Sequence, residues 1–261
     1  MLVAEGAALM SVDLSQLTVL CTAFGARGGL ERLARSVHSL HPQVKILAAG
    51  PSASDATCVG VDIVKSGAGD TPGSVRNALL ARVRTPYFAL VGDEMELHAR
   101  APLTDLLAPV AQEQVDLAAG ELVECRKKLL VLTSRQPAPG HGCFSHESGG
   151  LALRPGLGAV SDGVSRCDYA HQFFVARTDK VRAMGGWDHQ LISGGDLEFF
   201  VRAERFDLRI GVEPALTAWH WGHASPPSET VSVEAVERMN LARLCLPNGA
   251  VVTPPPARMA A

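Results

Sequence analysis

Short apolar runs alternate with amphipathic stretches through the first third of the chain. Four of these runs are predicted to be strands, at 17–24, 44–49, 59–64 and 87–91, and the first has the composition of a strand buried on both faces. An apolar stripe at helical spacing over 30–40 ends at Pro42, and a second helix is predicted over 74–83 with Ser74 as its cap. Strands that alternate with helices predict an α/β fold, a mostly parallel, Rossmann-like sheet flanked by helices.

The rest of the chain carries a weaker version of the same pattern. Helices are predicted over 102–115, 179–184 and 196–203, and strands over 129–133, 172–176 and 208–212. Residues 134–166 are rich in Gly, Pro, Ser and His and are predicted to form a long functional loop. We therefore expect a flexible N-terminus (1–13), a single domain (14–246) and a disordered proline-rich tail (247–261).

Composition excludes several classes of protein. Hydrophobic residues make up 47% of the chain, which is ordinary for a globular protein, and the net charge of -3 argues against a nucleic-acid partner. No apolar stretch is long enough for an integral membrane segment, and the start of the chain does not read as a secretory signal. Six scattered cysteines without a CxxC pair favour reduced thiols, so we expect a cytoplasmic protein. A homo-oligomer is compatible with the sequence.

An acidic pair follows directly on the strand predicted over 87–91. Asp93 and Glu94, with Glu96 close behind, stand where a buried strand reaches the surface. Carboxylates at such a position are costly to desolvate unless a cation is present, and Mg²⁺ or Mn²⁺ would also bind phosphate oxygens. An acidic pair after a strand is more often a solvated loop or a helix cap, so this motif needs support from others.

A second motif opens the helix predicted over 74–83. Gly73 permits close approach of the backbone, and the N-terminus of a helix binds anions. Arg76 and Asn77 in the first turn are within reach of a diphosphate or a sugar. The alternative is a capped surface helix with a solvated arginine.

A third motif is the phrase GGDLEFF, in which a double glycine precedes Asp196. A carboxylate at a helix N-terminus can act as a cap, or as a general base that takes a proton from an attacking hydroxyl. Glu198 is the reserve candidate for the base. Its aromatic neighbours Phe199 and Phe200 also fit a buried structural partner.

A fourth motif, WHWGH, carries His220 and His223 just past a predicted strand. An imidazole there can complete a metal site, although a histidine among tryptophans is more often a packed residue. We assign the metal role to one of the two histidines and favour His223.

Taken in order, these segments resemble a GT-A glycosyltransferase, and specifically the animal β-1,4-N-acetylgalactosaminyltransferases that make gangliosides. The resemblance runs over residues 17–224, except 134–166. It rests on LERLARSVHSLHPQVKIL, on GSVRNALLARVRTPYFALVGDE, on HQFFVARTDKV followed by GGDLEFF, and on GHAS. It implies a GT-A fold and an inverting, metal-dependent transfer of a sugar, as in family 2-like enzymes.

The resemblance also assigns roles to single residues. Glu94 stands at the last acid of the family's Asp-x-Asp motif, Asp93 at the middle one, and Gly92 replaces the first. His223 stands at a histidine that can complete the metal site. Asp196 lies in the region of the catalytic base, where the ganglioside enzymes carry a histidine.

The donor site is expected at the end of the first strand. Thr22, Phe24 and Arg27 are assigned to donor binding together with Gly73, Arg76, Asn77, Gly92 and Asp93. GT-A enzymes that use UDP-sugars commonly place an acid after the second strand to receive the uracil ring. This chain has no acid there before Asp55, so the donor base stays open. The animal relatives are membrane-anchored, and no anchor is expected here.

The sequence therefore predicts an inverting glycosyltransferase that uses a nucleotide-diphosphate sugar and Mn²⁺ or Mg²⁺. Two alternatives stay open. The segment FGARGG after the first strand is a faint version of the glycine-rich loop of a nucleotidyl- or phospho-sugar transferase. The incomplete Asp-x-Asp motif fits a catalytically degenerate protein that binds sugar nucleotides.

Overall fold

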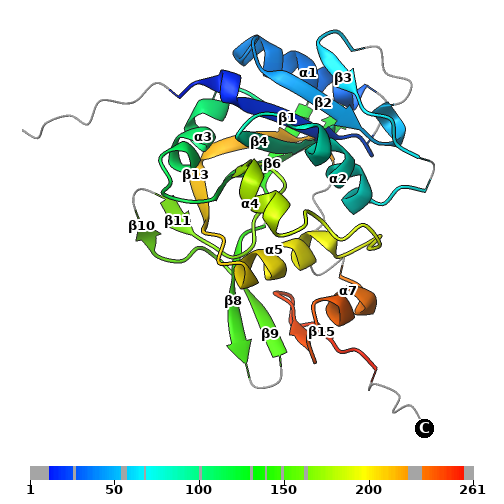
Figure 1. Ribbon diagram of the computed structural model, residues 1–261, viewed down its shortest axis with the longest axis vertical. Helices are drawn as coiled ribbons and strands as arrows, with labels where there is room; N and C mark the ends of the chain where they lie inside the picture. The colour runs from blue at the N-terminus through cyan, green and yellow to red at the C-terminus, as the bar shows by residue number, and fades with distance from the viewer. Residues whose placement is uncertain are drawn as a thin grey trace, which may run out of the picture.

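The structure is a computed structural model (Figure 1). It describes residues 12–25, 28–53, 58–67, 69–99, 102–129, 132–138, 140–147, 150–161, 164–222 and 231–255.

Among the described residues, two sheets organise the molecule. The larger has eleven strands in the order β10-β11-β13-β6-β12-β4-β1-β2-β3, with β5 added to β13 and β7 to β6. The smaller has the order β15-β14-β9-β8. The strands are β1 (Leu17–Thr22), β2 (Lys45–Ala49), β3 (Val61–Ile63), β4 (Tyr87–Gly92), β5 (Met95–Glu96), β6 (Leu117–Leu129), β7 (Leu132–Pro137), β8 (Gly142–Glu147), β9 (Gly150–Pro155), β10 (Val160–Ser161), β11 (Val164–Arg166), β12 (Phe174–Arg177), β13 (Ile210–His220), β14 (Leu244–Cys245) and β15 (Val251–Val252).

The first four strands form a parallel block in the order β3-β2-β1-β4. All six residues of β1 are buried, as expected for a strand with helices on both faces. Strand β12 then inserts antiparallel between β4 and β6, and β6 pairs in parallel with β13. The predicted α/β class is confirmed, with a mixed rather than uniformly parallel sheet.

Helices cover both faces of the larger sheet (Figure 1). Side chains from α1 and α3 pack with Val19 and Cys21 of β1, whereas α2, α4, α5 and α7 pack on the face that carries Leu20. This division follows from the alternation of side chains along a strand. The helices are α1 (Gly29–Leu40), α2 (Pro72–Arg82), α3 (Leu103–Ala111), α4 (Thr178–Ala183), α5 (Gly195–Arg205) and α7 (Val233–Arg238), with short 3₁₀ turns η1 (Leu14–Gln16) and η2 (Pro51–Ala53).

The prediction of a long loop over 134–166 is wrong. The segment carries most of β7 and all of β8 to β11, and β8 and β9 form a hairpin in which Phe144 faces Leu153. Glycine and polar residues at the exposed positions disguised the alternation of strands that are buried on one side only.

Two further expectations need correction. Strand β6 was not predicted, and β13 runs from Ile210 to His220, far beyond the predicted 208–212. In the expected disordered tail, Val251–Val252 pairs with β14, so the ordered chain continues past residue 246. Within the described ranges, every helix is too short or too polar to cross a bilayer.

Candidate functional site

A cavity of about 280 Å³ opens at the carboxyl ends of β1 and β4, between α2 and the start of α5. Ligands of open α/β sheets bind at this edge. Six residues selected from the sequence line the cavity: Thr22, Phe24, Gly73, Arg76, Glu94 and Asp196. The structure thus brings together three motifs that are far apart in the sequence.

Asp93 lies behind the cavity wall and is fully buried. Its carboxylate accepts hydrogen bonds from the backbone N–H of Gly25, at 2.9 and 3.1 Å. A Cβ at Gly25 or Gly29 would collide with Asp93, so glycine at both positions permits the close approach. Burial and the neighbouring Glu94 charge raise the pKa of Asp93 to about 7.

Glu94 lines the cavity and is only partly buried. Its side chain folds back over Gly92, where any Cβ would strike the carboxylate. Glycine at position 92 therefore leaves room for this placement of the Glu94 side chain. Burial acts to raise the pKa of Glu94, but hydrogen bonds and the charge of His220 bring it below its usual value.

His220, the last residue of strand β13, lies beside Glu94. The pairing of β13 with β5 sets His220 opposite Met95, and the Trp221 N–H donates to the Glu94 carbonyl at 2.8 Å. His220 Nε2 lies 3.5 Å from Glu94 Oε1. Its Nδ1 is buried and has no hydrogen-bond partner among the described residues.

These residues fit a divalent cation. Among the described residues, no lysine or arginine forms an ion pair with Asp93 or Glu94, and the pKa of Asp93 is raised first by burial and then by the charge of Glu94. The orphaned His220 nitrogen belongs to a ring that already faces Glu94. A cation held by Glu94 and His220 would relieve this imbalance. His223, favoured from the sequence, lies outside the described residues, as does Arg27.

Arg76 reaches the cavity from the first turns of α2. The helix is capped by Thr71, whose hydroxyl accepts from the Ser74 N–H at 3.1 Å, and not by Ser74 as predicted. The Arg76 side chain is only 5% exposed and donates to Asp196 Oδ1 at 2.6 Å. Its charge is paired with Asp196, and its side chain also lines the cavity, so donor binding by Arg76 stays a prediction.

Asp196 stands in the first turn of α5, after Gly194, whose φ of 76° suits glycine. Its Oδ2 accepts a hydrogen bond from the Gln172 amide, so both carboxylate oxygens have a partner. The side chain is still 34% exposed and lines the cavity. It is thus oriented by its neighbours and accessible to a substrate.

Two other predicted residues do not line the cavity. The Asn77 side chain bonds both the N–H and the carbonyl of Trp187, at 2.9 and 2.7 Å, and so fixes the turn. Glu198 forms a two-point ion pair with Arg202 at 2.7 and 2.8 Å. Both contacts are structural, which corrects the donor-binding expectation for Asn77 and leaves Asp196 as the candidate base.

Sequence reasoning missed Gln172 as a partner of Asp196 and Trp187 as a partner of Arg76. The Trp187 ring stacks on Phe199 at 4.7 Å and lies under the Arg76 guanidinium at 5.8 Å. The signal that could have found Gln172 is its place in HQFFVARTDKV, one of the phrases on which the family resemblance rests.

No family model matches the chain. Among curated proteins, beta-1,4 N-acetylgalactosaminyltransferase 1 of Mus musculus is 35% identical over 143 residues, which cover 52% of this chain and 25% of the relative. The Homo sapiens protein of the same name is 35% identical over 147 residues, with the same coverage. The chain thus matches about a quarter of the length of these relatives.

Solved structures place the fold. GalNAc-T7 with UDP, GalNAc and Mn²⁺ has a TM-score of 0.65 at 11% identity, over 85% of this chain and 47% of that one. S. aureus TarS residues 1–349 with UDP-GlcNAc has a TM-score of 0.58 at 11% identity, over 85% and 65%. The fold is the GT-A fold of these glycosyltransferases, as the resemblance predicted.

Proposed function

We propose that this protein is a glycosyltransferase that moves a sugar from a nucleotide diphosphate to an acceptor hydroxyl, in a single displacement with inversion. The observation that carries the proposal is that Glu94 and Asp196 line one cavity at the strand ends of a GT-A fold. One acid is placed for the leaving diphosphate and the other for the attacking hydroxyl.

The donor we propose is a UDP-N-acetylhexosamine. The matched relatives are named for transfer of N-acetylgalactosamine, and the similar structures were solved with UDP and GalNAc or with UDP-GlcNAc. The base site lacks an acid directly after β2, where Gly50 and Pro51 follow Ala49. Asp55 lies outside the described residues, so backbone groups of this edge are proposed to bind the uracil ring.

Glu94 and His220 are the residues we propose to hold a divalent cation, Mn²⁺ or Mg²⁺, with His223 as a further ligand. Such an ion supplies positive charge to the leaving diphosphate. Asp93 supports the site from behind, because its carboxylate fixes the Gly25 backbone at the end of β1. Thr22 and Phe24 then shape the donor side of the cavity.

Asp196 is proposed as the general base. The acceptor hydroxyl would give its proton to the Asp196 carboxylate as its oxygen attacks the anomeric carbon. Arg76 and Gln172 orient the carboxylate, and Trp187 supports Arg76 from below. Two apolar side chains at the rim, Phe24 and Ile192, are exposed and offer a surface for the apolar face of a sugar.

The test is an incubation with UDP-GlcNAc or UDP-GalNAc, Mn²⁺ and a panel of hydroxyl acceptors, followed by separation of the nucleotides. The proposal predicts release of UDP that rises with acceptor. A nucleotidyl- or phospho-sugar transferase would instead form or consume pyrophosphate. A protein that only binds sugar nucleotides would leave the donor intact, and either result would overturn the proposal.

A further inference from the structure

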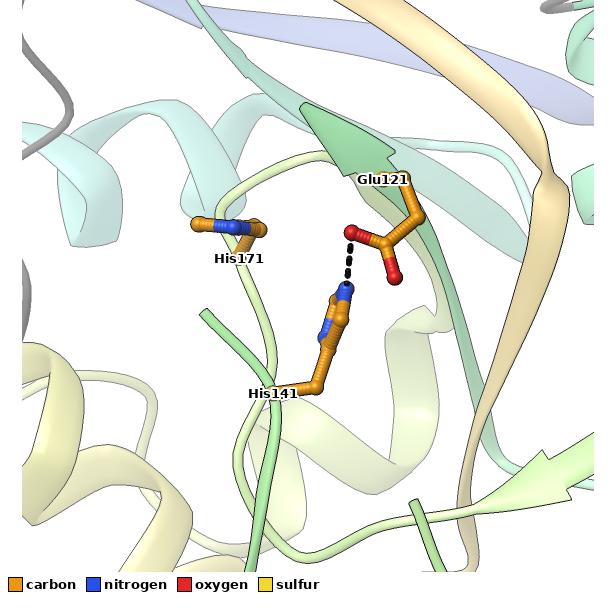
Figure 2. A group of neighbouring side chains, drawn as sticks. All are labelled: Glu121, His141 and His171. Carbon is orange, nitrogen blue, oxygen red and sulfur yellow. Dashed lines mark ion pairs between the residues drawn. The ribbon is translucent and has the colours of Figure 1, made fainter. Parts of the chain in front are cut away.

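A second group of metal-type side chains lies on the larger sheet, outside the cavity lining. Glu121, His141 and His171 each present one ligand atom, and these atoms all lie within 4.8 Å of one another. Figure 2 shows the three side chains converging from different parts of the chain. Glu121 comes from β6, His141 from the turn before β8, and His171 from the segment before β12.

The geometry of His141 is unusual for an ordinary ion pair. Its Nε2 lies 3.1 Å from Glu121 Oε2, and its side chain is only 6% exposed. The contact lacks hydrogen-bond geometry, and among the described residues neither ring nitrogen has a hydrogen-bond partner. A buried imidazole with no partner costs free energy, so the site calls for an additional group.

His171 is held in the form that a metal requires. Its Nε2 lies 3.2 Å from the carbonyl oxygen of Ala138. A carbonyl can only accept, so Nε2 carries the proton and the Nδ1 lone pair stays free. Histidines that bind metals almost always donate their other N–H to a carbonyl or a carboxylate in this way.

Two imidazoles and one carboxylate form a nitrogen-rich set of ligands. Nitrogen-rich sets favour late first-row ions such as Zn²⁺, whereas oxygen donors favour Mg²⁺ and Mn²⁺. Ligand atoms around a tetrahedral Zn²⁺ lie about 3.4 Å apart. The 3.1 Å pair of Glu121 and His141 matches that spacing, and a small movement of His171 would complete it.

We propose that Glu121, His141 and His171 form a second metal site, one that binds a single Zn²⁺-type ion. The site would fasten the turn before β8 to β6 and to the segment that carries Gln172. Because the Gln172 amide donates to Asp196, the ion would help to position the candidate base without touching the substrate.

The test uses the full chain, stripped with a chelator and titrated with Zn²⁺ by calorimetry. One equivalent should bind to Glu94→Gln, and the wild type should bind that equivalent plus any ion taken up by the proposed Glu94–His220 site. His141→Ala and His171→Ala should each weaken binding by more than the roughly 10- to 100-fold that loss of a supporting hydrogen bond costs. The matched control is His146→Ala, since His146 also pairs with a glutamate at 2.9 Å but is 72% exposed. That variant should bind Zn²⁺ like the wild type.

Two further variants keep the result interpretable. Glu121→Gln preserves the shape of the side chain and should also lose affinity while retaining the wild-type circular dichroism spectrum. Glu94→Gln should keep Zn²⁺ binding, because the nearby Glu94–His220 pair is not part of the set. The proposal is overturned if the wild type binds no Zn²⁺, if His141→Ala binds as many equivalents as the wild type with the same affinity, or if Glu94→Gln binds no Zn²⁺. None of these outcomes depends on transferase activity.

Discussion

The two acids that line the cavity differ in how their charge is balanced. Asp196 forms a 2.6 Å ion pair with the buried Arg76 and accepts a second hydrogen bond from Gln172. Glu94 lies next to a second acid, Asp93. Within the described residues, the only ion-pair partner of Glu94 is His220, whose Nε2 lies 3.5 Å from Glu94 Oε1. One acid is neutralised by the protein itself, and the other is left with an excess of negative charge.

This difference separates two kinds of acidic site. A carboxylate that the protein neutralises needs no ligand to be stable, so its exposed face can serve as a base. A pair of carboxylates left without a cation is stable only because a proton or a metal ion balances it. Asp93 and Glu94 belong to the second kind, since burial and the charge of Glu94 together raise the pKa of Asp93 to about 7.

The largest expected effect comes from removing the base. Asp196→Asn keeps the hydrogen bond from Gln172 but cannot take a proton, so turnover should fall by about 10²- to 10⁴-fold. Affinity for UDP should stay unchanged, because Asp196 is not placed against the diphosphate. Steady-state kinetics and calorimetry measure the two quantities separately. Turnover like that of the wild type would remove Asp196 from the mechanism.

Trp187→Ala should destabilise the side of the cavity that carries Arg76 and Asp196. The ring packs between Arg76 and Phe199, and loss of a buried tryptophan costs about 3–5 kcal/mol. Denaturant unfolding measures this free energy. Phe206→Ala is the control, because Phe206 follows the same helix α5 and is 53% exposed. Equal losses for the two variants would show that the Trp187 stack contributes little.

Asn77→Ala should lower the free energy of unfolding by less than Trp187→Ala does. It removes both hydrogen bonds to the Trp187 backbone and should cost about 1–3 kcal/mol. Asn248→Ala is the control, since Asn248 bonds a nearby N–H in an exposed turn. A drop in stability no larger than that of the control would contradict the role assigned to Asn77.

A further expected effect is on the pH dependence of stability. The raised pKa of Asp93 means that the folded state holds this proton more tightly than the unfolded chain does. In chelator, the resulting stabilisation is present at low pH and is lost as pH rises from about 4 to about 7. Thermal melts should show a flatter profile for Asp93→Asn.

The control for this profile is Asp62→Asn, because Asp62 is an exposed carboxylate in a surface pair with Lys45. Its melts should follow the wild-type curve across the same range. A wild-type slope in Asp93→Asn would show that another group carries the pH dependence.

Much of the parallel half of the fold could be predicted from the sequence. Strands β1, β2 and β4 are largely apolar and buried, and α1 has one apolar stripe, so local pattern and tertiary structure agree there. Strands β6 to β11 could not be predicted, because they alternate irregularly and depend on pairing with distant partners such as β13.

Some residues of the candidate site could likewise be selected from the sequence, and others could not. Glu94 and Asp196 were found because each follows a clear local signal, a strand end and a helix start. The neutralisation of Asp196 by Arg76 could not be found, because it joins residues 120 positions apart. The group of Glu121, His141 and His171 has no sequence spacing that marks it, since three separate elements bring it together.

The most direct test of the central claim is the affinity for UDP with and without Mn²⁺, measured by calorimetry on the wild type and on Glu94→Gln. If Glu94 is the acid left without a cation, Mn²⁺ should strengthen UDP binding to the wild type, and this gain should disappear in Glu94→Gln while Asp196→Asn retains it. A UDP affinity that ignores Mn²⁺ in the wild type, or a gain that survives in Glu94→Gln, would contradict the account.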